Sequence, residues 1–205
     1  MTHRARGSVL AGASGGRYVS LQTAPREAWQ RVGIGELAAS ASPAVLHAVL
    51  GSCVSVCLYD PVEKIGGINH ILISSAHPDC CFAARCGIQA MELLINAMMN
   101  LGADRRRFVA KAFGGANVLP NFKPPTVGEL NARFVRKFLV TEKIPLLAER
   151  LGGTDAVRLS FDTGNGRARV HTVSGVKLPE IVREEDTYYH TDIADRFHIE
   201  EPTIF

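Results

Sequence analysis

The chain has 205 residues, of which 46% are hydrophobic, so it is long and apolar enough to bury the core of one domain. It carries 23 lysine and arginine residues against 20 acidic ones, and a net charge of +3 is too mild to predict nucleic-acid binding. Arg105-Arg106-Arg107 is the only basic run and is typical of a solvated helix end or loop, and no aromatic residues are interleaved with it.

The first 27 residues are rich in glycine, serine, alanine and arginine, and we interpret them as a mobile tail. The folded domain is expected to span residues 28–178. Near its start, Leu50–Tyr59 and Ile65–Ile73 are rich in β-branched and aliphatic residues and predict two strands. Asp60-Pro61-Val62-Glu63 between them has the residue order of a type I turn, so the two strands are expected to form an antiparallel hairpin.

Two helices are predicted in the middle of the chain. Residues 83–101 carry apolar side chains at helical spacing, and Gly102 supplies the stop. Residues 108–113 then predict a strand that precedes a proline-rich loop. After that loop, Thr126 with Glu129 forms a capping-box signature, which predicts the start of the second helix.

Three further strands are predicted over residues 144–149, 156–161 and 168–173, with a hairpin turn at Asp162–Gly166. The sequence then becomes polar and acidic, and we interpret residues 179–205 as an extended C-terminal tail. The pattern as a whole predicts a single α+β domain, a mixed α/β sandwich whose largely antiparallel or mixed sheet is flanked by helices.

No apolar segment predicts a membrane span, because the longest one, residues 88–99, is short and contains Gln89, Glu92 and Asn96. The N-terminus has no apolar leader with a small-residue cleavage site. The five cysteines are an odd number and do not indicate a disulfide framework. We therefore expect a cytoplasmic protein without membrane insertion, in a reducing compartment where a thiol stays free.

The pair Cys53 and His70 is the feature most informative about function. If Asp60 pairs with Glu63 across the predicted turn, Cys53 falls directly opposite His70 in the hairpin. Side chains directly opposite each other share a face, with Cβ atoms roughly 4.5–5.5 Å apart, so an imidazole would lie beside a thiol. A β-bulge at Gly66-Gly67 would shift this register by one residue.

This pairing matters because the thiolate, not the thiol, is the nucleophile. An imidazole beside Cys53 can accept the thiol proton, and the thiolate can then attack a carbonyl or carboxamide carbon. Gly51 and Ser52 are small, so backbone N–H groups at this position can approach the oxyanion that forms. On spacing alone, a buried packing cysteine is the commoner outcome, since free cysteine is among the most buried residue types.

Several motifs are spaced along the chain in a recognisable order. They are Gly33–Glu36, Leu50–Pro61, Gly67–His70, Lys111–Asn117, Val127–Asn131 and Leu147–Glu149 with Gly152-Gly153. In this order they resemble the CheD family of chemoreceptor glutamine deamidases. The resemblance runs from about Val32 to about Val173, which is most of the chain.

The resemblance implies that Cys53 is the nucleophile and His70 the general base of a protein-glutamine deamidase that releases ammonia through a thioester. It also implies a threonine about half a dozen positions before the cysteine, where this chain has His47-Ala48-Val49. Either His47 orients or acidifies the site, or the third role is absent. The resemblance further implies a sheet between helical layers, chemoreceptors and a CheC-type phosphatase as partners, and no cofactor.

The segment around Gly114 and Gly115 is the second candidate for the site. It lacks the lysine and the spacing of a phosphate-binding loop. A close backbone approach, either to the substrate chain or to the Cys53 segment, is the better interpretation. Asn117 either binds the substrate amide or serves the turn.

His77, Cys80, Cys81 and Cys86 form a cluster in the sequence that resembles a metal site only superficially. Their spacing does not match common structural zinc patterns, and adjacent cysteines fit poorly in one tetrahedral site. We expect no metal here, and oxidation-sensitive surface thiols are the alternative.

A non-catalytic adaptor that binds receptors or a phosphatase is the alternative function. It is motivated by the missing threonine and by the late segment, where Arg150-Leu151 replaces the acidic residue that the family resemblance implies. A cysteine hydrolase acting on another protein amide would share the chemistry and differ only in its substrate.

Overall fold

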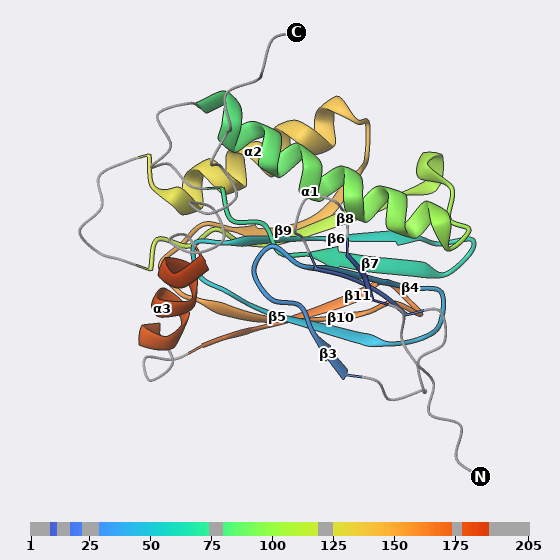
Figure 1. Cartoon of the computed structure of the whole chain (residues 1–205), viewed down its shortest axis with the longest axis horizontal. Coiled ribbons are helices and arrows are strands. Elements are labelled where there is room, and N and C mark those ends of the chain that lie inside the picture. Colours follow the sequence, from blue (N-terminus) through green and yellow to red (C-terminus); the bar gives the residue numbers. More distant parts are fainter. Residues whose placement is uncertain are drawn as a thin grey trace, which may run out of the picture.

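The computed structural model describes residues 9–11, 17–21, 29–73, 80–118, 125–173 and 178–188, within which the chain forms two β-sheets and three α-helices (Figure 1). The helices are α1 (Cys80–Asn100), α2 (Val127–Thr141) and α3 (Leu178–Tyr188), and a short 3₁₀ helix covers Arg105–Arg107.

The larger sheet has seven strands and is mixed. In spatial order these are β1 (Val9–Ala11), β2 (Arg17–Leu21), β4 (Leu37–Ser40), β7 (Ile65–Asn69), β6 (Val54–Asp60), β8 (Val109–Gly114) and β9 (Leu146–Leu151). Strand β2 is parallel to β4 and β8 is parallel to β9, whereas the other neighbours are antiparallel. Strands β1 and β2 lie in the segment expected to be a mobile tail, so that expectation is wrong for their residues.

The smaller sheet has four strands and is also mixed. In spatial order these are β11 (Arg167–Thr172), β10 (Val157–Asp162), β5 (Val45–Leu50) and β3 (Trp29–Arg31). Strand β3 is parallel to β5, and the other neighbours are antiparallel. The predicted hairpin turn between β10 and β11 is confirmed, because the Gly166 N–H donates to the Asp162 carbonyl at 2.9 Å.

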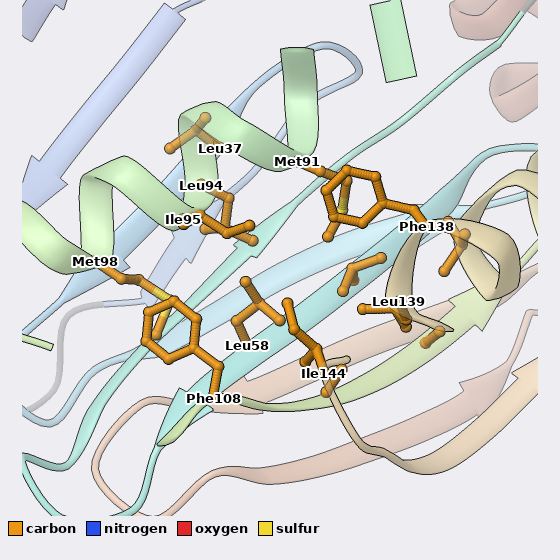
Figure 2. Close-up of a cluster of buried hydrophobic side chains, with 14 of the residues drawn as sticks. Leu37, Leu58, Met91, Leu94, Ile95, Met98, Phe108, Phe138, Leu139 and Ile144 are labelled. Carbon is orange, nitrogen blue, oxygen red and sulfur yellow. The ribbon is translucent and has the colours of Figure 1, made fainter. Parts of the chain in front are cut away.

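Helices α1 and α2 cover one face of the larger sheet, and the smaller sheet covers the other (Figure 1). Side chains from both helices meet β6 and β8 in a buried cluster that includes Leu58, Met91, Leu94, Phe108 and Leu139 (Figure 2). A second cluster lies between the sheets and includes Leu46, Ala48, Cys57, Ile68 and Leu159. The predicted α+β class with mixed sheets is confirmed, but the second helical layer implied by the family resemblance is a sheet instead.

The two long helices follow from the sequence signals that predict them. Of the six apolar side chains at helical spacing in and just after α1, Met91, Leu94, Ile95 and Met98 are fully buried, Leu101 is partly buried and Ile88 is exposed. The predicted capping box of α2 is present, since Thr126 Oγ1 accepts from the Glu129 N–H at 3.3 Å and Glu129 Oε2 accepts from the Thr126 N–H at 2.9 Å. Among the described residues, no helix combines the length and the apolar character needed to cross a membrane.

The β6–β7 hairpin has a different register from the predicted one. Asp60 pairs with Ile65 rather than with residue 63, so the loop holds four residues. Lys64 closes this longer loop at a positive φ of 55°, and the Asp60 side chain accepts backbone N–H groups within it. The pairing is displaced by two residues, which keeps every side chain on its predicted face. Cys53 therefore lies diagonally from His70, not directly opposite it.

Helix α3 forms where the sequence predicts an extended tail, and this prediction is wrong for its residues. Ile181 is buried in a small apolar cluster with Ala116 and Ala156. Arg31 Nη2 donates to both carboxylate oxygens of Glu184, at 2.6 and 2.7 Å. The local polarity of the segment gives no sign of these contacts, which come from distant parts of the chain.

The basic run is partly solvated as predicted, with Arg106 exposed, but its last residue, Arg107, anchors the β6–β7 hairpin. Asp60 is fully buried, and Arg107 donates to it from Nε at 3.0 Å and from Nη2 at 2.7 Å. The Asp104 N–H adds a further hydrogen bond at 2.9 Å. Burial alone would raise the pKa of Asp60, but the Arg107 and backbone hydrogen bonds outweigh it and lower the pKa to about 2.

We expect Asp60→Asn to destabilise the fold by about 2–4 kcal/mol at neutral pH, because the Arg107 guanidinium loses its buried carboxylate. The folded pKa of Asp60 lies below the unfolded value near 4, so its contribution is present above that value. It is lost as the pH falls toward about 2, and the difference between wild type and variant should shrink there. Urea unfolding at neutral pH and at about pH 3 measures both effects.

Glu63→Gln is the matched control, because Glu63 is a half-exposed partner of the same Arg107 guanidinium. It should cost less than about 0.5 kcal/mol. Equal losses in the two variants would contradict the anchoring role of Asp60.

Candidate functional site

A three-residue segment, Gly51-Ser52-Cys53, carries the chain from β5 in the smaller sheet to β6 in the larger sheet. Its first and last carbonyl groups are held by the loop after β8. The Ala116 N–H donates to the Gly51 carbonyl at 2.8 Å, and the Gly115 N–H donates to the Cys53 carbonyl at 2.7 Å. Hydrogen bonds from the loop after β8 therefore fix the direction of Gly51-Ser52-Cys53, which we call the crossing segment.

Asn131 on α2 holds the middle carbonyl of the crossing segment. Its side chain is fully buried, and its Nδ2 donates to the Ser52 carbonyl at 3.0 Å. Its Oδ1 accepts from the Ile73 N–H at 2.7 Å. One amide side chain thus satisfies a donor and an acceptor, and it ties the crossing segment to the chain that follows β7.

The glycine pair after β8 makes this close approach possible. Gly114 has a φ of +103°, and a Cβ there would overlap the carbonyl oxygen of Cys53. Gly115 has a φ of +68°, and a Cβ there would lie 2.9 Å from the Gly128 carbonyl oxygen. The glycine pair is expected to approach either the substrate chain or the Cys53 segment. In the structure it approaches the Cys53 segment. The backbone N–H of Asn117 donates to the Gly153 carbonyl at 2.7 Å, and the role of its side chain stays a prediction.

Cys53 and His70 share the face of the larger sheet that packs on the smaller one. The Cys53 side chain is fully buried in the cluster between the sheets, which also includes the buried Cys57. The bridge between Val54 and Ile71 makes Cys53 and His70 diagonal neighbours across β6 and β7. Backbones of diagonal neighbours lie roughly 7–8 Å apart, a separation that an aromatic side chain can span.

His70 is held by the loop before β4. Its N–H donates to the Glu36 carbonyl at 3.0 Å, and its carbonyl accepts from the Gly35 N–H at 2.9 Å. Its Nδ1 lies 3.1 Å from the Val32 carbonyl oxygen. Because a carbonyl can only accept, Nδ1 carries the proton in this arrangement.

The other ring nitrogen of His70 is the basic one. Nε2 is buried and has no hydrogen-bond partner among the described residues. Burial lowers the pKa of His70 to about 4, so the ring is neutral at pH 7. A neutral imidazole with a free Nε2 is the form that accepts a proton.

Glu185 of α3 lies on the N–H side of the crossing segment. Its Oε1 accepts from the Ser52 N–H at 2.9 Å and from the Cys53 N–H at 3.2 Å. Its Oε2 accepts from the Ser52 hydroxyl at 2.6 Å. Burial raises the pKa of the Cys53 thiol, and the Glu185 charge and its hydrogen bond raise it further. The thiol is therefore protonated at neutral pH while this carboxylate is in place.

His47 lies apart from Cys53 and His70. Strand β5 alternates, so that Leu46 and Ala48 face the core between the sheets and His47 faces the opposite side. Its Nδ1 lies 2.9 Å from Ser160 Oγ. The structure thus brings Gly51, Ser52, Cys53 and His70 to one region and leaves His47 outside it.

The cysteine cluster lies largely beyond what the structure describes. His77 is outside the described residues, and so are the side chains of Cys80, Cys81 and Cys86 in the N-terminal part of α1. Among the side chains that are described, no group of three or more His, Cys, Asp or Glu residues could hold a metal ion.

Sequence reasoning identifies neither Val32, Asn131 nor Glu185 as part of the site. Val32 acts through its backbone carbonyl, which no side-chain pattern reveals. Asn131 gives one usable signal, since it is a polar residue on the buried face of α2, in line with Val135. Glu185 gives none, because an acidic residue in a polar segment normally faces solvent.

Comparisons with known proteins place the chain in a family. A family model described as CheD chemotactic sensory transduction matches residues 74–172. The probable chemoreceptor glutamine deamidase CheD of Stenotrophomonas maltophilia strain K279a is 46% identical over 140 residues, which are 68% of this chain and 71% of that protein. This chain belongs to the CheD family.

Other CheD relatives are similarly close. Proteins of the same name from Xanthomonas campestris pv. campestris strain B100 and Sinorhizobium medicae strain WSM419 are 46% and 44% identical. The first match covers 68% of this chain and 71% of that protein, and the second covers 65% and 73%. Among solved structures, the Bacillus licheniformis hypothetical protein YfiH aligns with a TM-score of 0.36 at 18% identity, over 55% of this chain and 49% of that one. That similarity is too low to indicate a common fold.

We expect Gly114→Ala to destabilise this CheD-family chain by at least about 2 kcal/mol more than Gly152→Ala. Both glycines have positive φ, so a side chain strains the backbone at either position. Only at Gly114 would the new Cβ overlap the Cys53 carbonyl, whereas nothing lies within 4 Å of a Cβ at Gly152. Urea unfolding of the two variants measures the difference. Equal destabilisation would contradict the close approach to the crossing segment.

Proposed function

We propose that this chain is a cysteine-dependent protein-glutamine deamidase that converts glutamines of chemoreceptors to glutamates in chemotaxis adaptation. Its CheD relatives carry the name probable chemoreceptor glutamine deamidase. The observation that carries the proposal is that the Ser52 and Cys53 N–H groups bind one carboxylate oxygen beside a buried thiol. Two such donors are what the oxyanion of an acyl-transfer intermediate needs.

The first half of the reaction forms a thioester. His70 Nε2 accepts the proton of the Cys53 thiol as the sulfur attacks the carboxamide carbon of the substrate glutamine. The carbonyl oxygen becomes an oxyanion, which accepts hydrogen bonds from the Ser52 and Cys53 N–H groups. The C–N bond then breaks, the His70 imidazolium gives its proton to the leaving nitrogen, and ammonia departs.

The second half hydrolyses the thioester. His70 Nε2 accepts a proton from water as its oxygen attacks the thioester carbon, and the same two N–H groups hold the second oxyanion. The C–S bond breaks, Cys53 regains its proton and a glutamate remains on the receptor. Thiol, imidazole and water supply every step, so the reaction requires no cofactor.

The neutral resting pair fits general-base catalysis better than a preformed ion pair. Burial disfavours both the thiolate of Cys53 and the imidazolium of His70. Charge is therefore expected to develop only when the substrate carboxamide is in place and the oxyanion can be held. The Val32 carbonyl fixes the tautomer that leaves Nε2 of His70 free, and this chain does so without the threonine that the family resemblance implies.

The proposal includes the partners of the chain and its location in the cell. Glutamines on the cytoplasmic domains of chemoreceptors are the substrates, which places the chain in the cytoplasm. A CheC-type phosphatase is the second partner. Each deamidation adds a negative charge to a receptor helix, and like charges on neighbouring helical positions repel.

Intact-mass analysis of a receptor cytoplasmic fragment tests the proposal. With the wild-type chain, each modified glutamine should gain about one dalton, because an amide nitrogen is replaced by oxygen. Cys53→Ala should lower the rate by at least about 10³-fold, because the nucleophile is gone. His70→Gln should lower it by about 10²- to 10⁴-fold, the range typical of a general base.

Cys57→Ala is the matched control, because Cys57 is a buried cysteine on the same strand face and only packs there. It should retain the deamidase rate. If the wild type binds the fragment but produces no mass gain, the proposal fails and the adaptor alternative is favoured. An equal loss in both cysteine variants would show that Cys53 is not the nucleophile.

A further inference from the structure

Helix α3 presents one side chain to the donors of the proposed site. Glu185 accepts hydrogen bonds from the Ser52 N–H, the Cys53 N–H and the Ser52 hydroxyl, as described above. The first two donors are those assigned to the substrate oxyanion. The carboxylate therefore occupies the position where the carboxamide of a substrate glutamine has to lie.

Contacts on either side of Glu185 seat the helix. Ile181 lies one helical turn earlier on the same face and is buried in the cluster with Ala116 and Ala156. Glu184 binds Arg31 of β3 through both carboxylate oxygens. That ion pair is exposed, so it contributes orientation more than free energy.

Gly51 allows the helix to come this close. A Cβ at Gly51 would lie 2.9 Å from Glu185 Oε1 and 2.9 Å from Ile181 Cγ2. Figure 1 shows α3 at one end of the two sheets, apart from the layer formed by α1 and α2. The crossing segment thus forms one wall of a site that holds a helix, with an acidic side chain pointing at the N–H groups.

We propose that α3 is a tethered product mimic, which competes with the receptor helix for this site and holds the chain in a resting state. Glutamate is the product of glutamine deamidation, so Glu185 has the structure of a side chain that has already reacted. The proposal rests on the proposed function for the identity of the competing substrate. It does not rest on it for the covering of Cys53, which the contacts of Glu185 describe directly.

A carboxylate suits this role for two physical reasons. Its carbon is a poor electrophile, so the Cys53 thiolate cannot react with it as with an amide. Its charge also opposes formation of the thiolate, since it raises the pKa of the Cys53 thiol. A receptor helix that displaces α3 with a neutral glutamine removes that charge and supplies the reactive carbon in the same step.

Glu185→Ala tests the competition through two readouts. Alkylation of Cys53 by iodoacetamide needs an uncovered thiol but no deamidase activity. Deamidation of a receptor fragment needs both an uncovered thiol and deamidase activity. Each rate should rise at least about tenfold, because three hydrogen bonds to a charged group are lost from the closed state. Glu180→Ala, which removes an exposed acidic residue of the same helix, should leave both rates unchanged.

The outcomes separate this proposal from the proposed function. A faster alkylation without receptor deamidation in any variant supports the covering by α3 and overturns the deamidase. Unchanged alkylation in Glu185→Ala overturns the covering. A slower receptor deamidation in this variant overturns the mimic, because Glu185 would then assist the reaction. Alkylation of Cys57 reports unfolding, since Cys57 is buried in the same cluster.

Glu185→Gln keeps the size of the side chain and makes the chain its own substrate. Residue 185 should gain about one dalton as its carboxamide is hydrolysed to a carboxylate with loss of ammonia. The gain should be absent when Cys53→Ala is added. If the wild type deamidates the receptor fragment while the glutamine at this position persists, Glu185 does not occupy the substrate position.

Discussion

The fixed direction of Gly51-Ser52-Cys53 is the constraint on which the rest of the site depends. Its three carbonyls are held by the loop after β8 and by Asn131, so the N–H groups of Ser52 and Cys53 are left to bind an acceptor. These anchors belong to elements that pack on the larger sheet. The hydrophobic core that places α2 and β8 therefore also sets the geometry of two polar donors.

The position between two sheets gives the site its chemical character. Cys53 and His70 lie where the chain leaves the smaller sheet and where β7 ends, and both side chains are buried. Burial keeps both neutral and strengthens any hydrogen bond made to a developing charge. The same burial raises the pKa of the Cys53 thiol and so lowers its reactivity, and Glu185 raises this pKa further. Activity and restraint thus use one pair of N–H groups.

Much of the fold follows from local signals in the sequence, whereas the errors come from one unusual backbone conformation and from contacts between distant parts of the chain. The capping box of Thr126 and Glu129 predicts the start of α2 because all its partners lie within one turn. The hairpin register is wrong by two residues because Lys64 adopts a positive φ that the turn sequence does not indicate. Cys53 and His70 were identifiable because a two-residue shift preserves the face. The contact of helix α3 with the site could not be identified from the sequence, because Glu185 binds partners 132 and 133 positions away in the chain.

A crystal structure of the Cys53→Ala chain bound to a receptor helix with an unmodified glutamine would test the central claim most directly. The account predicts that the glutamine carbonyl oxygen accepts from the backbone N–H groups of positions 52 and 53. It also predicts that Glu185 has left those donors, with α3 displaced from Gly51. A bound receptor helix with Glu185 still on the Ser52 N–H would contradict it, because substrate and α3 would then occupy different sites.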